Sequence, residues 1–122
     1  MKIFLSISSY KDPLLVNTLQ SAYENAHHKE NIVFAVVDQS ESRLDLEECS
    51  FIEQIRYLHL DAKYARGCAG ARSLAQSLFM GEDYFFQVDS HTIFEDGWDE
   101  YFIKYYRDIS KKFHRPVISN YP

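Results

Sequence analysis

The stretch NIVFAVVD, residues 31–38, decides the fold class. Between Asn31 and Asp38 every residue is apolar, and most are β-branched or aromatic. A short unbroken run of this kind is typical of a strand that is covered on both faces, as in a parallel sheet. A second run, DYFFQVD at residues 83–89, likewise ends on an acid. The sequence therefore predicts buried parallel strands that end on acidic side chains.

The segments around these two runs alternate between strand and helix patterns. Apolar residues at helical spacing predict helices after Asp12-Pro13, over residues 69–80 and from Trp98. In the first helix, Asp12 is expected to be the N-cap and Pro13 the first helical residue. The predicted strands cover residues 2–8, 31–38, 54–61, 83–89 and 116–120. This alternation predicts one α/β domain over residues 1–122, with an open, mostly parallel sheet and helices on both faces.

Composition and charge argue against several classes of protein. With 122 residues, 46% of them hydrophobic, the chain can bury one sizeable core. A net charge of -5 disfavours binding to nucleic acid or to an anionic membrane surface by bulk electrostatics. No apolar run approaches the roughly 20 residues that span a bilayer, and the first residues lack the pattern of a secretory signal. We expect a cytoplasmic protein in which Cys49 and Cys68 are reduced thiols.

Polar residues close or follow each predicted strand. In a parallel sheet the carboxyl ends of the strands lie at one edge, where ligands bind. The polar residues at these ends are Ser8, Ser9, Tyr10, Asp38, Asp61, Arg66, Asp89, Ser90 and His91. We expect this edge of the sheet to carry the chemistry of the protein.

Asp89 and His91 form the first candidate site. Two residues apart in an extended segment, their side chains would leave on the same side and could bind one cation together. Mixed oxygen and nitrogen ligands suit manganese or another transition ion better than calcium, and such an ion could hold a diphosphate in an acidic protein. Taken alone, an acid and a histidine at this spacing are also compatible with a surface role; their position at a strand end favours the metal site.

The segment ARGCAGARSLAQSL, residues 65–78, forms the second candidate site. Arg66 and Arg72 could donate paired hydrogen bonds to phosphate near the start of a helix, although solvated arginines in a glycine-containing loop are the plainer interpretation. The glycines Gly67 and Gly70 match neither the dinucleotide-binding fingerprint nor the phosphate-binding loop of nucleoside triphosphatases. Dinucleotide oxidoreduction and triphosphate hydrolysis are therefore disfavoured.

These motifs together resemble those of a known family. ISSYKDP (7–13), QIRYLHLDAKYARGCAGARSLAQSLFMGEDYFFQVDSH (54–91) and F-x-x-G-W-D (94–99) look like the GlcNAc-transferase family that includes the cytoplasmic protein-hydroxyproline GlcNAc-transferases. The D-S-H triplet followed by G-W also resembles the metal site of polypeptide GalNAc-transferases, which have the GT-A fold. The resemblance covers nearly all of the chain and implies a GT-A-like, Rossmann-like domain.

The resemblance also implies an activity and roles for single residues. The protein would transfer GlcNAc, or a related sugar, from a UDP-sugar to a hydroxyl group of a protein or glycan, with manganese held by Asp89 and His91. Tyr10 would lie against the uracil and Asp38 would contact the base or ribose, although Tyr10 could instead cover the sheet edge and Asp38 could cap a turn. The residues implied to bind the UDP-sugar are Ser8, Ser9, Tyr10, Asp38, Arg66, Arg72 and Asp89.

Members of the family continue beyond the point at which this sequence ends. We therefore expect residues 1–122 to be the half that binds the sugar donor, truncated before the acceptor-binding part, with an exposed sheet edge through which two chains could pair. No catalytic base or nucleophile can be named. The alternatives are a non-catalytic nucleotide-sugar-binding module, or a truncated homologue without transferase activity, and a purely structural domain that binds neither UDP nor metal.

Overall fold

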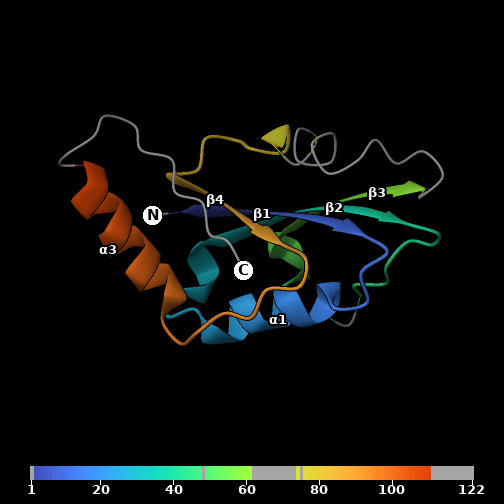
Figure 1. Ribbon diagram of the computed structural model, residues 1–122, viewed down its shortest axis with the longest axis horizontal. Coiled ribbons are helices and arrows are strands. Elements are labelled where there is room, and N and C mark those ends of the chain that lie inside the picture. Colours follow the sequence, from blue (N-terminus) through green and yellow to red (C-terminus); the bar gives the residue numbers. More distant parts are fainter. Residues whose placement is uncertain (1, 48, 62–73, 75, 111–122) are drawn as a thin grey trace.

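A four-stranded parallel sheet forms the centre of the structure, a computed structural model that describes residues 2–47, 49–61, 74 and 76–110. The strand order is β3-β2-β1-β4, and every neighbouring pair is parallel (Figure 1). The strands are β1 (Ile3–Tyr10), β2 (Ile32–Ser40), β3 (Ile55–Asp61) and β4 (Tyr84–Asp89). The helices are α1 (Leu15–Asn25) and α3 (Trp98–Ser110), and two 3-10 turns, η1 (Lys29–Asn31) and η2 (Ile52–Gln54), precede β2 and β3.

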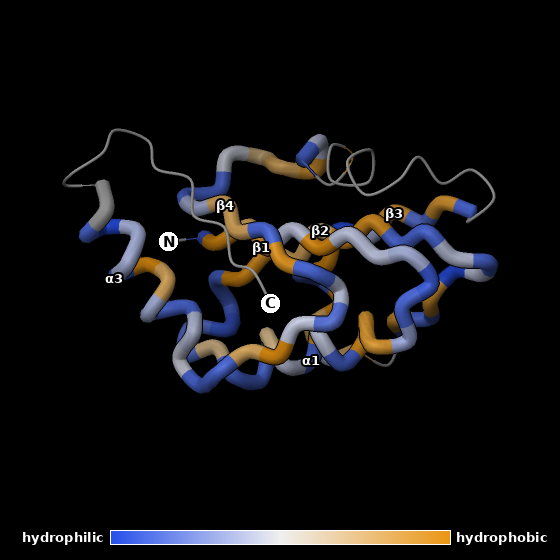
Figure 2. The backbone as a smooth tube through the Cα atoms, in the orientation of Figure 1, coloured by the Kyte–Doolittle hydropathy of each residue, from blue (hydrophilic) through white to orange (hydrophobic). Residues whose placement is uncertain are grey.

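One face of the sheet carries the main hydrophobic core. Strand side chains alternate between faces, so that residues such as Leu5, Phe34 and Phe86 point to the same side. There they pack with Leu19 of α1 and Phe102 of α3, whose ring stacks on Phe86 with centroids 4.5 Å apart. Figure 2 shows the hydrophobic colouring concentrated along the strands. This packing explains why the strands are almost wholly apolar.

The opposite face carries a second, smaller set of apolar contacts. Phe4 and Phe85 stack on this face, and Phe79 packs edge-on against Phe4 with ring centroids 5.2 Å apart. Val37 packs with Leu58, Leu60 and Leu74. Because apolar side chains cover both faces, β1 and β2 form the buried centre of the sheet, as expected for parallel strands.

Hydrogen bonds join the end of α1 to the start of α3. The carboxylate of Asp99, which is only 1% exposed, accepts the backbone N–H groups of His27 and His28, both at 2.8 Å. The indole Nε1–H of Trp98 donates to the carbonyl of Ala22 at 2.8 Å. These contacts hold α3 against the same face of the sheet as α1.

The structure confirms an α/β fold with a parallel sheet and corrects several predicted boundaries. β1 extends to Tyr10, so Ser8, Ser9 and Tyr10 are its last three residues and do not form a loop after it. Asp12 is not the N-cap of α1, because that helix begins at Leu15. Of the predicted helix over 69–80, the structure describes residues 74 and 76–80; residues 74 and 76 are helical, but 77–80 are turn or irregular, so the helix ends earlier than predicted. The whole of the predicted strand 116–120 lies outside the described residues. Within the described ranges, no helix has the length and apolar character needed to cross a membrane.

Candidate functional site

The chain changes direction within the sheet between β1 and β4. From β1 it proceeds to β2 and β3 on one side, and it then returns to place β4 on the other side of β1. In open parallel sheets, ligands bind beyond the carboxyl ends of the strands at such a reversal point. Ser8 of β1 and Asp89 of β4 are paired in register there, and Ser9 is paired with Asp38 of β2. The structure therefore brings four of the predicted site residues to one edge of the sheet.

The D-S-H triplet begins in β4 and continues into a turn. The strand ends at Asp89, and Ser90 and His91 form the turn that follows it. The hydroxyl of Thr92 donates to the carbonyl of Asp89 at 2.9 Å and closes this turn. The argument that Asp89 and His91 leave an extended strand on the same side is therefore wrong in its geometry, because the extended conformation stops at Asp89.

Asp12 holds the turn through two side chains of the triplet. Its Oδ2 accepts the hydroxyl of Ser90 at 2.6 Å and lies 3.3 Å from Nδ1 of His91, while its Oδ1 accepts the backbone N–H of Leu14 at 2.9 Å. Burial alone would raise the pKa of Asp12, but the hydrogen bonds from Ser90, Leu14 and His91 outweigh burial and lower the pKa below its ordinary value. Asp12 is therefore a carboxylate that accepts the hydroxyl of Ser90 and lies within hydrogen-bonding distance of the His91 ring.

Thr18 of α1 makes a second connection to the same turn. Its hydroxyl donates to the carbonyl of Ser90 at 2.6 Å and accepts the backbone N–H of Thr92 at 3.1 Å. The side chain of Thr18 is buried, so these hydrogen bonds are shielded from water. The first part of α1 and the segment before it thus fix the position of the triplet from two sides.

Asp38 also accepts hydrogen bonds; it lies two residues before the end of β2, which continues to Ser40, past the limit predicted at Asp38. The carboxylate is only 5% exposed, and its Oδ2 accepts a short hydrogen bond from the hydroxyl of Tyr57 and another, at 3.2 Å, from Ser40. Burial and the hydrogen bond to Asp38 raise the pKa of Tyr57 to about 12. The Tyr57 oxygen in turn accepts the backbone N–H of Leu44 at 2.9 Å. These contacts fix Asp38 at the rim of the sheet.

A cavity of about 320 Å³ lies beside Asp38, between the carboxyl ends of β1 and β2. Its polar lining includes Lys11, Asp12, Ser40 and Arg43. Two cationic side chains therefore stand with three carboxylates, those of Asp12, Asp38 and Asp45, around a space that opens at the same edge as Asp89. Tyr10, 57% exposed, precedes Lys11, whose ammonium lies 5.8 Å from the centre of the tyrosine ring.

Several buried polar side chains on the face that carries Asp89 have unused hydrogen-bonding capacity. By strand alternation, Ser6 and Ser8 of β1, Gln87 of β4 and Gln39 of β2 share this face with Asp89. Within the part of the chain that the structure describes, the hydroxyls of Ser6 and Ser8 and the amide nitrogens of Gln39 and Gln87 have no hydrogen-bond partner. Buried polar groups are normally paired, so these four side chains are exceptions, and they lie on the same face as Asp89.

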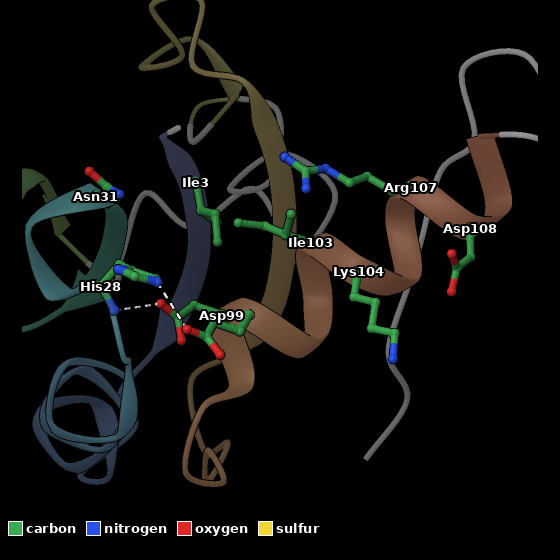
Figure 3. Close-up of a pocket in the computed structure, with 9 residues that line it drawn as sticks. Ile3, His28, Asn31, Asp99, Ile103, Lys104, Arg107 and Asp108 are labelled. Carbon is green, nitrogen blue, oxygen red and sulfur yellow. Dashed lines mark hydrogen bonds and ion pairs between the residues drawn. The ribbon is translucent and has the colours of Figure 1, made fainter.

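A larger cavity, of about 540 Å³, lies at the other end of the strands (Figure 3). Ile3 at the start of β1 and Asn31 just before β2 line it, together with residues of α3. Its charged side chains are of both signs, among them Asp99, Lys104 and Arg107. In Figure 3 the backbone N–H of His28 is joined to Asp99, the contact that links α1 to α3. This cavity is remote from the reversal point and shares no predicted site residue.

The remaining predicted site residues are Arg66, Arg72 and His91. Arg66 and Arg72 lie outside the described residues. His91 is about half exposed and next to Asp12. Of the residues that the structure describes, no three His, Cys, Asp or Glu side chains form a group that could hold a metal ion.

The comparison with protein families identifies the chain. A family model described as "Glycosyltransferase (GlcNAc)" matches residues 40–122. The chain belongs to the GlcNAc glycosyltransferase family. The match includes the D-S-H triplet and both arginines, Arg66 and Arg72, whereas β1, Asp12 and Asp38 precede it. No curated protein sequence matches this glycosyltransferase chain.

Sequence reasoning missed three residues of this site: Asp12, Thr18 and Tyr57. Asp12 was assigned to helix capping, and its contacts with Ser90 and His91 join residues 78 and 79 positions apart, which local spacing cannot reveal. Thr18 faces the core side of α1 and reads as an ordinary helical residue. Tyr57 lies between Arg56 and Leu58 in β3 and shows no sign of a site in the sequence; only the register with β2 places its hydroxyl near Asp38.

Proposed function

We propose that this glycosyltransferase binds a UDP-sugar, with UDP-GlcNAc as the expected donor, and transfers the sugar to a hydroxyl group of a protein or glycan with the help of a divalent metal, most suitably manganese. The observation that carries the proposal is the position of the D-S-H triplet: a segment matched by a GlcNAc glycosyltransferase family places its acid at the reversal point of the sheet, in register with Ser8. This is where an open parallel sheet binds its ligand.

The side chains present suit a metal-bound diphosphate. Asp89 and His91 would supply one oxygen and one nitrogen ligand, a set that fits manganese. When bound, the ion would supply positive charge for the diphosphate leaving group. The contact between His91 Nδ1 and Asp12 leaves Nε2 as the ring nitrogen that can ligate. Arg66 and Arg72 are proposed to neutralise further phosphate charge.

The cavity beside Asp38 suits the nucleoside part of the ligand. Asp38 is an acceptor for ribose hydroxyls or base N–H groups. The exposed ring of Tyr10, at the carboxyl end of β1, offers an aromatic face for the base. Lys11 lies next to both and adds a positive charge. On the other face of β1, the unpaired hydroxyls and amides around Ser8 and Gln87 are proposed to meet polar groups of the sugar or the phosphates.

The test is a calorimetric titration of UDP and of UDP-GlcNAc into the protein, with manganese and with chelator. We expect binding that requires manganese and that weakens at least tenfold in Asp89→Ala and in His91→Ala, since each variant removes one proposed protein ligand. Asp108→Ala, which removes an exposed acid on α3, is the matched control and should bind as the wild type does.

Two other outcomes would change the assignment. Absence of UDP binding at millimolar concentration, in a sample that circular dichroism shows to be folded, would contradict the donor site. Binding without release of labelled GlcNAc to water or to any hydroxyl acceptor would identify the chain as a nucleotide-sugar-binding module without transferase activity.

A further inference from the structure

We propose that Asp12 is a positioning residue for the metal site: it holds the imidazole of His91 in the tautomer that presents Nε2 to a cation. This inference deepens the proposed function and rests on it for the identity of the ligand. The observation behind it is the contact between Asp12 Oδ2 and His91 Nδ1, at 3.3 Å, which joins the segment before α1 to the turn after β4.

The hydrogen bonds around Asp12 determine which atom carries the proton. An ionised carboxylate only accepts hydrogen bonds, and at neutral pH an aspartate is ionised. The hydroxyl of Ser90 and the backbone N–H of Leu14 already donate to the two oxygens of Asp12. The third contact must also be donated to the carboxylate, so the proton of a neutral His91 lies on Nδ1. Nε2 then carries the free lone pair.

This arrangement is the one that metal-binding histidines use. A ligating histidine almost always donates its second ring N–H to a carboxylate or carbonyl, which fixes the ring and makes the ligating nitrogen more basic. The ring of His91 is half exposed, so packing alone does not fix its orientation. Asp12 is only 16% exposed and is itself held by Leu14 and Ser90, so it can provide a fixed reference point for the ring.

The anchoring of the turn supports the same conclusion. Thr18, buried in α1, holds the backbone on both sides of His91 through the carbonyl of Ser90 and the N–H of Thr92. The backbone of the turn is thus fixed by α1, and the side chain of His91 is oriented by the residue three positions before that helix. Both the backbone and the side chain of His91 are therefore held in place, as a precisely positioned metal ligand requires.

The first measurement needs neither a variant nor a metal. In protein labelled with ¹⁵N-histidine, long-range proton–nitrogen correlation at about pH 8.5, where an ordinary histidine is neutral, reports which ring nitrogen carries the proton. We expect His91 to be protonated on Nδ1, whereas a histidine without this contact favours protonation on Nε2. Protonation of His91 on Nε2 would overturn the inference, whatever the protein does with UDP.

The second measurement compares manganese affinity between two variants that each lose one acid. Asp12→Ala removes the contact with His91, and Glu95→Ala removes an exposed carboxylate from the loop that follows the turn. We expect manganese affinity, measured by electron paramagnetic resonance in folded samples, to fall about 10- to 100-fold in Asp12→Ala and less than about threefold in Glu95→Ala. Equal affinities in the two variants would show that Asp12 does not position the ligand.

The two measurements separate this inference from the proposed function. If the wild-type protein binds no manganese, the metal site itself is refuted and the role of Asp12 in ligation falls with it, even where His91 is protonated on Nδ1. If the wild type binds manganese and Asp12→Ala binds equally well, only the role of Asp12 is refuted.

Discussion

Asp38 and Tyr57 illustrate how single residues hold a charged group at the rim of the sheet. The carboxylate of Asp38 is only 5% exposed, so it needs hydrogen-bond donors in place of water. Its Oδ2 accepts two hydrogen bonds, and the one from the Tyr57 hydroxyl is the shorter. The same tyrosine accepts the backbone N–H of Leu44, so it ties β2 and β3 to the loop between them. Tyr57 is therefore expected to stabilise the site without contacting the ligand.

Replacing Tyr57 with phenylalanine should destabilise the fold by about 1.5–3 kcal/mol, because the variant leaves the buried Asp38 carboxylate without its shorter hydrogen bond and the N–H of Leu44 without an acceptor. Urea unfolding at pH 7 measures the change. Tyr101→Phe, which removes a hydroxyl from an exposed tyrosine of α3, is the matched control and should stay within about 0.5 kcal/mol of the wild type. Equal stabilities of the two variants would contradict this role.

Because the pKa of Tyr57 is raised, the stability that its hydrogen bond to Asp38 contributes should depend on pH. A tyrosine whose pKa is about 12 in the folded state and about 10 in the unfolded state keeps its proton longer when folded. Its contribution to stability is therefore complete below pH 10 and is lost as the pH rises toward 12. We expect the difference in unfolding free energy between wild type and Tyr57→Phe to shrink over this interval. A constant difference from pH 9 to pH 12 would contradict the assignment.

Among the elements, the connection between α1 and α3 depends on backbone geometry as much as on side chains. Gly97, just before α3, has φ of +73° and donates its N–H to the carbonyl of Asn25 at 2.7 Å. The ring of His27 lies against it: a Cβ atom on Gly97 would come within 2.8 Å of the ring. Asp99, at the start of α3, accepts two backbone N–H groups beyond the end of α1. Glycine is therefore needed here both for its backbone angle and for its lack of a side chain.

Gly97→Ala and Gly81→Ala form a matched pair that separates these two requirements. Both glycines have positive φ, but a Cβ on Gly81 would meet nothing within 4 Å. Each substitution should cost about 1–2 kcal/mol for the left-handed backbone. Gly97→Ala should cost more than Gly81→Ala, because the new Cβ would displace the His27 ring from its contacts with Asp96 and Glu100. Thermal unfolding measures both changes. A larger loss of stability in Gly81→Ala than in Gly97→Ala would refute this account of the connection between α1 and α3.

Hydrophobic pattern predicted the elements well and their ends less well. The apolar runs placed β2, β3 and β4 within one or two residues of their observed limits. β1 continues through Ser8, Ser9 and Tyr10 because backbone pairing with Asp38 and Gln39 of β2 extends it, and this pairing does not depend on apolar side chains. Asp12 has the sequence of a helix cap, yet α1 begins only at Leu15, and Oδ2 of Asp12 contacts Ser90 and His91. The end of β1 and the role of Asp12 are therefore set by contacts between segments distant in the sequence, which local pattern does not reveal.

In the molecule as a whole, the two ends of the sheet differ in chemistry. The amino end has the cavity of Figure 3, bounded by α3 and lined by charges of both signs. The carboxyl end gathers Asp12, Asp38 and Asp89 around the reversal point, with α1 holding the turn that contains His91. Only the carboxyl end combines predicted site residues with a strand order that favours ligand binding.

Amide hydrogen exchange followed by mass spectrometry can test this difference along the chain. In the free protein, exchange should be slowest in β1 and β2, because each pairs with a strand on both sides and lies in the core. If UDP and manganese bind at the reversal point, they should slow exchange further in residues 8–12 and 89–92, since a ligand held between the ends of β1 and β4 suppresses local opening there. Added protection confined to residues 28–31 and 99–108 would place the ligand in the cavity of Figure 3 and contradict the site, because those segments line the opposite end of the sheet.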